Sequence, residues 1–183
     1  MQCVTGPTDS ARGQHERVGY KFTGDFVVKK TLLTATLTCT LSHSTLLRNA
    51  IGPQVFEELT YLLNSVRHDN SRVLLISSSM NVFCSGLDLH YFLKKHFNTT
   101  EKMLDALRLF LLELTAFPKP IVLGVNGAAV GLGAALLPLC DVVYASDKAV
   151  FSMPYAQLGQ TPEAGASHTL PSLLGGALIA EEC

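Results

Sequence analysis

PIVLGVNGAAVGLGAALLPLCD, residues 120–141, is the stretch that decides the fold, because it carries no charge before its final aspartate and contains four glycines. Residues 121–123 have the pattern of a short buried strand. Asn126-Gly127 is typical of a turn, and residues 128–137 predict an apolar helix. A strand, a glycine-rich turn and the start of a helix present free backbone N–H groups. The stretch therefore predicts part of the core and a place where a ligand can bind the backbone.

Three other interpretations fit this stretch less well. A transmembrane helix needs about twenty apolar residues, but Asn126, the glycines and Pro138 interrupt that length. A phosphate-binding P-loop has Lys and Ser or Thr after its last glycine, where two alanines stand here. The glycine spacing also resembles the nucleotide turn of short-chain dehydrogenases, with Tyr144 and Lys148 in place of their Tyr/Lys pair. That pair lies far downstream in dehydrogenases, and here it almost touches the glycines.

The composition indicates one globular domain and excludes several classes of partner. A chain of 183 residues with 48% apolar and 16% charged residues is long and apolar enough to bury a core. A formal net charge of −1 gives no reason to expect nucleic acid or an anionic membrane as a direct partner. The five cysteines form no C-x-x-C pair, so we expect no disulfide framework and no metal site, and a reducing compartment.

We expect residues 1–24 to be a flexible leader and residues 25–183 to be one domain. The leader is polar, mixed in charge and lacks the apolar segment of a secretory signal. The domain then begins with a strand over 34–41, in which threonines alternate with apolar residues. Residues 26–28 are its candidate hairpin arm.

Strand and helix patterns alternate along the rest of the chain. We predict helices over 53–66, 87–97 and 101–117, strands over 73–76, 141–145 and 149–152, and a loop that begins at Ser77. The apolar face of the 53–66 helix comprises Val55, Phe56, Leu59, Leu62, Leu63 and Val66. The expected buried stripe of the 101–117 helix comprises Met103, Leu104, Leu107, Phe110, Leu111 and Leu114. Such alternation implies a layered α/β domain with parallel strands joined by right-handed crossovers.

A second loop, residues 82–88 (VFCSGLD), also lies between a strand pattern and a helix pattern. Gly86 allows a tight backbone there. Two such loops could direct two backbone N–H groups at one carbonyl oxygen. That arrangement is an oxyanion hole, which stabilises the enolate of a thioester.

These motifs resemble those of the crotonase (enoyl-CoA hydratase/isomerase) superfamily, from residue 26 to the C-terminus. The resemblance rests on FCSGLD at 83–88, Lys119-Pro120 with Asn126-Gly127, and the run from Gly131-Leu132-Gly133 to Cys140-Asp141. It implies a spiral of ββα turns that assembles into trimers and binds acyl-CoA or CoA, with no separate cofactor. It also implies that the thioester oxygen is held by the backbone N–H groups of Leu87 and Leu132. The implied substrate pocket comprises Cys84, Ser85, Gly86, Asp88, Gly131, Ala135 and Tyr155.

Two departures from the family pattern bear on function. Hydratases of this family use two glutamates, and Ala135 and Tyr155 stand at those positions here. Neither side chain can serve as a carboxylate base, so we do not expect two-glutamate hydration. The family also continues beyond residue 183 into helices that cover the pocket and build the trimer. We therefore expect a domain truncated at its C-terminus, with an impaired tendency to form a homotrimer.

Two branches of the family resemble the chain most, and they lead to different functions. Resemblance to the C-terminal domain of chromodomain Y-like proteins implies a nuclear corepressor module with histone deacetylase contacts and weak or no catalysis. This is the leading hypothesis. The alternative is a Δ3,Δ2-enoyl-CoA isomerase, either peroxisomal or mitochondrial. LGQTPE at 158–163 resembles its active loop, and a single carboxylate, Glu163, would then carry the proton. A third interpretation, that Glu163 is an ordinary surface loop residue, stays open.

Overall fold

Strand β3 (Thr36–Leu41) follows the alternation in its sequence, because Leu37, Cys39 and Leu41 are buried while the threonines between them are half-buried. The structure is a computed structural model that describes residues 17–21, 27–33, 36–41, 47–93 and 98–175. β3 pairs antiparallel with β2 (Val27–Leu33), but it does so through residues 31–33. Residues 27 and 28 of the predicted hairpin arm belong to β2 and pair with residues 21 and 20 instead. Residue 26 lies outside the described residues.

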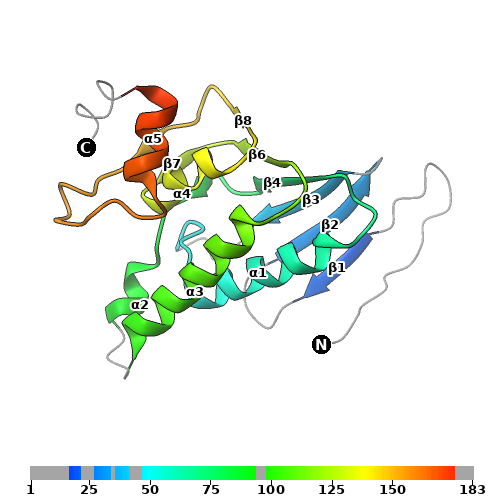
Figure 1. The fold of residues 1–183 in the computed structure, drawn as a ribbon, viewed down its shortest axis with the longest axis horizontal. Coiled ribbons are helices and arrows are strands. Elements are labelled where there is room, and N and C mark those ends of the chain that lie inside the picture. The colour runs from blue at the N-terminus through cyan, green and yellow to red at the C-terminus, as the bar shows by residue number, and fades with distance from the viewer. Residues whose placement is uncertain (1–16, 22–26, 34–35, 42–46, 94–97, 176–183) are drawn as a thin grey trace.

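The larger sheet has the order β1-β2-β3-β4-β6-β8 (Figure 1). Its strands β4 (Val73–Ser78), β6 (Ile121–Val125) and β8 (Val142–Ala145) continue from β3 in parallel, which confirms the prediction of parallel strands. Sequence patterns did not predict β1 (Arg17–Lys21), which pairs antiparallel with β2 and lies in the segment assigned to a leader. The rest of that segment lies outside the described residues.

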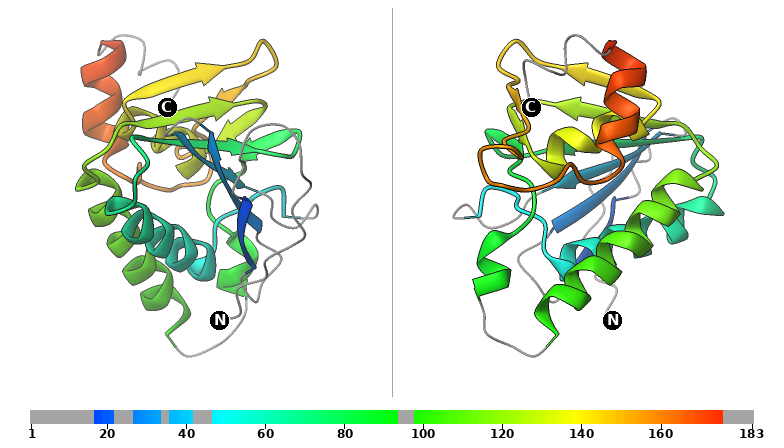
Figure 2. Two further views of the ribbon diagram at one scale, coloured as in Figure 1. Left: turned by 90° about the vertical axis from the view of Figure 1, so that its right-hand side faces the viewer. Right: turned by 60° about the vertical axis from the view of Figure 1, so that its left-hand side comes forward.

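A smaller parallel sheet contains β5 (Val82–Cys84), β7 (Ala128–Val130) and β9 (Phe151–Ser152). Each of these short strands follows a strand of the larger sheet and precedes a helix. The pairs β4–β5, β6–β7 and β8–β9 lead to α2 (Leu89–Leu93), α4 (Leu132–Ala135) and α5 (Ala166–Leu174) respectively. Three successive ββα turns result, so the predicted spiral is confirmed. Figure 2 shows their strands stacked in order.

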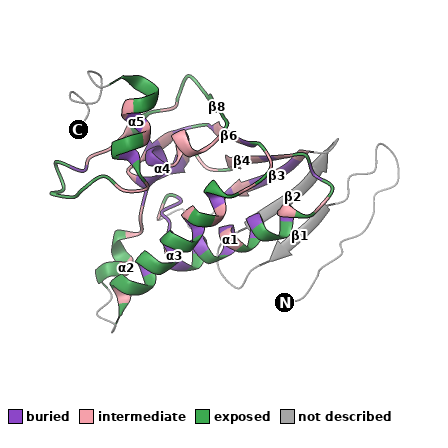
Figure 3. Cartoon of the chain, in the orientation of Figure 1, coloured by how far each residue is buried: buried purple, intermediate pink, exposed green. Residues whose placement is uncertain are grey.

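Helices α1 (Pro53–Arg67) and α3 (Thr99–Thr115) pack against one another on the same side of the larger sheet (Figures 1 and 2). All six residues of the predicted apolar face of α1 are buried. The rings of Phe56 and Phe110 are 5.5 Å apart at the contact. The buried stripe of α3 is narrower than predicted, because Leu104 is 56% exposed and Leu111 is half-buried. Figure 3 shows the resulting division of α3 into a buried and an exposed face.

The helix predicted over residues 128–137 is confirmed only for residues 132–135 and is wrong at its start. Residues 128–130 form β7, since their backbone pairs with β5 and β9, and the helix α4 starts only after Gly131, whose φ is +52°. A short 3-10 helix, η1 (Leu137–Leu139), follows α4. β4 continues through Ser78, beyond the predicted start of the loop at Ser77. No described helix is long and apolar enough to cross a membrane.

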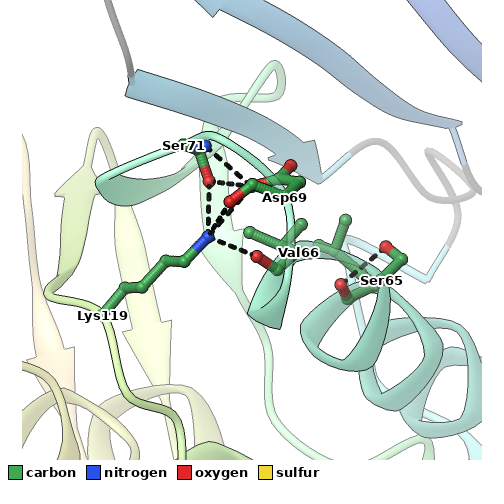
Figure 4. Close-up of polar contacts among 6 residues, drawn as sticks. Ser65, Val66, Asp69, Ser71 and Lys119 are labelled. Atoms are coloured by element: carbon green, nitrogen blue, oxygen red, sulfur yellow. Dashed lines mark hydrogen bonds and ion pairs between the residues drawn. The ribbon is translucent and has the colours of Figure 1, made fainter.

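Lys119 ties the end of α1 to the start of β6 (Figure 4). Its Nζ donates to the carbonyl oxygens of Val66 (2.5 Å) and Asp69 (2.9 Å) and to Asp69 Oδ1 (3.0 Å). Ser71 also donates its backbone N–H to Asp69 Oδ1 at 2.9 Å. Because the side chains of Lys119 and Asp69 are only 15% and 21% exposed, this ion pair is largely removed from water. The Lys119-Pro120 motif thus positions the strand that leads to β7.

We predict that Lys119→Met lowers the free energy of unfolding by about 2–3 kcal/mol, because it removes hydrogen bonds from a charged donor and leaves Asp69 half-buried without its cation. Chemical denaturation measures the change. Lys102→Met, at an exposed position on α3, is the matched control and should stay within about 0.5 kcal/mol of the wild type. Equal effects of the two substitutions would contradict the role given to Lys119.

Candidate functional site

The loop after β5 is held as an extended segment by Ile51. The Ile51 N–H donates to the Gly86 carbonyl at 2.7 Å, and the Asp88 N–H donates to the Ile51 carbonyl at 2.9 Å. In such a parallel bridge, the residue between the two that bond to the partner, here between Gly86 and Asp88, directs its own N–H away from that partner. Leu87 is that residue, and among the described residues its N–H has no acceptor. Its N–H is therefore available to a ligand on the side away from Ile51.

Two side-chain hydrogen-bond donors, a half-buried serine and a buried asparagine, hold this loop against residues 47–49. Ser85 Oγ lies 2.9 Å and 2.8 Å from the carbonyl oxygens of Leu47 and Arg48. The Asn49 side chain, 2% exposed, donates to the carbonyl oxygens of Val82 (3.2 Å) and Phe83 (3.1 Å). Ser85, a predicted pocket residue, therefore helps to hold the loop in place. Sequence reasoning missed Asn49 and Ile51.

The two glycine-containing loops that the sequence singled out are in direct contact. A Cβ on Gly86, whose φ is +89°, would lie 2.9 Å from the Val130 carbonyl oxygen and 3.5 Å from the Leu132 nitrogen. A Cβ on Gly133 would lie 2.8 Å from Cys84 Cβ. Only glycines permit this approach, and it brings the segments that contain Leu87 and Leu132 side by side.

Glu163 reaches this junction from the turn before α5. Its Oε1 lies 3.8 Å from the position of a Cβ on Gly131. Burial raises the pKa of the Glu163 carboxyl, and the nearby Tyr155 side chain and Leu132 backbone N–H oppose that rise. The side chain is half-buried and directed at the glycine loop, although the residues before it are exposed.

Cys84 lies beside this carboxylate but does not act as a nucleophile. The thiol is 1% exposed, and its Sγ accepts a hydrogen bond from the Gly86 N–H at 3.4 Å. Burial raises the pKa of Cys84 to about 12, and the negative charge of nearby Glu163 adds to the rise, while the Gly86 hydrogen bond opposes it. Cys84 is therefore a protonated thiol at neutral pH and fills space beneath the loops.

The other predicted pocket residues have separate roles. Asp88 Oδ1 accepts the His90 N–H at 3.0 Å, so Asp88 fixes the start of α2. Ala135 is fully buried and packs with Ala166 and Leu170 of α5, away from solvent. Tyr155 is 4% exposed. Within the described ranges, no three His, Cys, Asp or Glu side chains gather where they could hold a metal ion.

A spiral of ββα turns with two glycine loops in contact is the arrangement found in the enoyl-CoA hydratase/isomerase family. The sequence profile of that family matches residues 38–183. The chain belongs to the enoyl-CoA hydratase/isomerase family. This agrees with the resemblance drawn from residues 83–88 and 131–133.

Three relatives illustrate the range within the family. The chain is 43% identical to testis-specific chromodomain protein Y 1 of Homo sapiens over 134 residues, which are 71% of this chain and 25% of that protein. It is 38% identical to enoyl-CoA delta isomerase 2 of Rattus norvegicus over 137 residues, 73% of this chain and 35% of that protein. The crystal structure of an enoyl-CoA hydratase from a Polaromonas species superimposes with a TM-score of 0.77 at 31% identity, covering 85% of this chain and 62% of that one.

The chain spans about a quarter of the length of the chromodomain relative and 62% of the solved hydratase. The relatives therefore include both branches that the sequence resembles, the chromodomain Y-like proteins and the enoyl-CoA isomerases.

We predict that Gly86→Ala destabilises the fold by about 1–3 kcal/mol more than Gly159→Ala. Both glycines have a positive φ, at which alanine costs about 1–2 kcal/mol. A Cβ at Gly159 meets nothing within 4 Å, whereas one at Gly86 meets the Val130 carbonyl. Denaturant unfolding measures the free energy of unfolding of the two variants, and the difference between them reports the contact between the loops. Equal destabilisation would show that this contact is not tight.

Proposed function

We propose that this domain binds an acyl-CoA thioester at the junction of the two glycine loops and that Glu163 can move a proton along a bound 3-enoyl chain. The observation that carries the proposal is the position of the Glu163 carboxylate, next to the Leu132 N–H and directed into the junction. A loop carboxylate with no such role would be expected to lie in water.

In this mechanism the thioester oxygen accepts hydrogen bonds from the Leu87 and Leu132 N–H groups. The Glu163 carboxylate removes a proton from C2, and the electron pair of that C–H bond moves toward the thioester oxygen as a dienolate forms. The same carboxyl group then returns the proton to C4, which leaves the double bond between C2 and C3. No net oxidation occurs, and one carboxylate suffices because it is regenerated in each cycle.

Hydration is not part of the proposal. Adding water across the double bond would call for a second carboxylate to activate the water, and the two hydratase positions hold Ala135 and Tyr155. Ala135 is fully buried against α5, where an ionised side chain would be costly without a partner. A single proton-carrying group supports a 1,3-proton shift and not a two-residue hydration.

The second candidate is a binding module with weak or no catalysis, acting as a corepressor in the nucleus through histone deacetylase contacts. The 43% identity to a chromodomain protein favours it. An isomerase would instead belong in peroxisomes or mitochondria. Both candidates use the same acyl-CoA pocket, and both include assembly into a homotrimer.

We predict that Glu163→Gln lowers turnover of a 3-enoyl-CoA by at least about 100-fold, because the amide cannot take up the proton. Calorimetry of a saturated acyl-CoA should show that binding survives, since the loop N–H groups are unchanged. Glu101→Gln, at an exposed position on α3, is the matched control and should leave turnover intact.

Unchanged turnover in the Glu163 variant would contradict the proton-carrying role. Binding without turnover in the wild type would favour the corepressor module over the isomerase. Absence of both would contradict the thioester pocket itself.

A further inference from the structure

The hydrogen bonds that direct the Leu87 N–H belong to a bridge that is only one residue pair long. Ile51 pairs with Leu87 in parallel, and both residues lie outside the strands of the two sheets. The bridge consists of the Ile51 N–H bonded to the Gly86 carbonyl at 2.7 Å and the Asp88 N–H bonded to the Ile51 carbonyl at 2.9 Å. Within the described residues 47–52 and 82–88, no neighbouring pair extends it. The bridge is therefore too short to fix its own register.

The register of this bridge decides where the Leu87 N–H points. Alternate residues of an extended segment direct their N–H groups to opposite sides. A slip of one residue would make Leu87 one of the residues bonded to the segment that contains Ile51, and its N–H would face that segment. Under the proposed function, the thioester oxygen would then lose one of its two donors. The register must therefore be held by a contact outside the bridge.

The side chain of Asn49, two residues before Ile51, makes such a contact with the strand that precedes the loop. Its Nδ2 lies 3.2 Å from the Val82 carbonyl oxygen, 3.1 Å from the Phe83 carbonyl oxygen and 2.8 Å from Ser78 Oγ. Because the side chain is only 2% exposed, water does not compete for these hydrogen bonds, and losing them would leave buried polar groups unpaired. The segment is thus attached to β5 by the asparagine and to the following loop by the bridge.

The backbone between the two attachments is a tight turn. Arg48 and Asn49 have φ values of +47° and +57°, a region in which asparagine is enriched. The Ala50 N–H donates to the Leu47 carbonyl at 2.8 Å and closes the turn. Only one residue separates Asn49 from Ile51, so a displacement of the asparagine is passed directly to the bridge.

Ser85 makes a second contact with this turn, but a weaker one. Its hydroxyl has a single hydrogen to donate, and the carbonyl oxygens of Leu47 and Arg48 lie 2.9 Å and 2.8 Å from it. The serine is half-buried, whereas Asn49 is buried and has two hydrogens to donate. The asparagine is therefore the stronger determinant of the register.

We propose that Asn49 is a positioning residue: its buried amide sets the register of the bridge between Ile51 and Leu87 and so keeps the Leu87 N–H directed at the thioester oxygen. The inference rests on the proposed function, because the donor that it positions is one of the two assigned to the thioester. Asn49 acts through Ile51 and does not itself touch the ligand.

Two substitutions remove the amide while accepting the same backbone conformation. Asn49→Asp keeps the size of the side chain and removes both N–H donors, and Asn49→Gly removes the side chain without adding a charge. Asn126→Ala is the matched control, because the Asn126 Nδ2 also donates to two backbone carbonyls, those of Ser78 (3.3 Å) and Met80 (2.6 Å), and has no contact with the bridge.

The first measurement is hydrogen exchange of the ligand-free protein, followed by NMR at the Ile51 and Asp88 N–H groups. Exchange is compared with that of the backbone amides of α1, so that a general loss of stability cancels. We expect both N–H groups to exchange about tenfold faster in the two Asn49 variants, the effect of losing about one hydrogen bond, and to be unchanged in Asn126→Ala. Unchanged exchange in the Asn49 variants would overturn the proposal.

The second measurement is calorimetry with a saturated acyl-CoA and with its thioether analogue, which lacks the carbonyl oxygen. The two ligands share the CoA part, so a smaller folded fraction weakens both equally and leaves the ratio of their Kd values unchanged. We expect the wild type to favour the thioester, the Asn49 variants to lose about threefold to tenfold of that preference, and Asn126→Ala to retain it. A smaller structural effect of Asn49 would not change this ratio.

The two measurements separate the failure of this inference from the failure of the proposed function. Asn49 variants that keep the full preference for the thioester would overturn the positioning role and leave the thioester site intact. Equal affinity of the wild type for both ligands would reject the thioester site, and the positioning role with it.

A third measurement, on the wild type alone, covers the case in which neither Asn49 variant folds. If the asparagine holds the bridge, its side-chain N–H groups and the N–H groups of Ile51 and Asp88 should become open to exchange at one common rate. A bridge that opens much more often than the Asn49 amide would overturn the proposal.

Discussion

The contact between the loop after β5 and the loop after β7 is the constraint on which the site depends. It is a contact of backbone with backbone, since a Cβ at Gly86 would press on the Val130 carbonyl and one at Gly133 would press on Cys84. The ββα repetition produces it, because β5 and β7 are parallel neighbours and their following loops leave the sheet at the same edge. Ligand sites in parallel sheets form at such carboxyl ends of strands. The bridge from Ile51 then fixes the direction of the Leu87 N–H.

The chemistry of the site depends on opposing influences on the charge of one carboxylate, that of Glu163. Burial disfavours the charge on Glu163, and the nearby Tyr155 side chain and Leu132 N–H favour it. A carboxylate balanced in this way accepts and releases a proton more readily than one in water at neutral pH. The Leu132 N–H lies near this carboxylate and, under the proposed function, also donates to the thioester oxygen, so the base and the bound carbonyl meet at one backbone group.

Much of the fold could be predicted because its main elements have strong local patterns. The threonine alternation of β3 and the apolar face of α1 were both found from periodicity. The error at residues 128–130 has a tertiary cause: an apolar run of alanine and valine favours no single state, and pairing with β5 and β9 makes it a strand. Helix α5 was missed because it contains Pro171, which local rules treat as a helix breaker. The exposure of Leu104 depends on how α3 sits against α1, which spacing alone does not give.

The site could be predicted in part. The two glycine loops were found from their motifs, and their contact was expected from the family resemblance. Asn49 and Ile51 lie in a segment without periodicity, so their support of the loop at residues 84–88 needed the structure. Tyr155 and Glu163 lie near one another although they are eight positions apart across an exposed loop, and no local pattern encodes this proximity.

The most direct test of the central claim is a titration of 15N-leucine-labelled protein with a saturated, unreactive acyl-CoA, followed through the backbone amides of Leu87 and Leu132. The account predicts that both amide protons move downfield together as the thioester oxygen binds, and that a thioether analogue without the carbonyl does not produce this change. If neither amide responds while the ligand binds, the thioester oxygen does not lie between the two loops, and the site assigned to it is wrong.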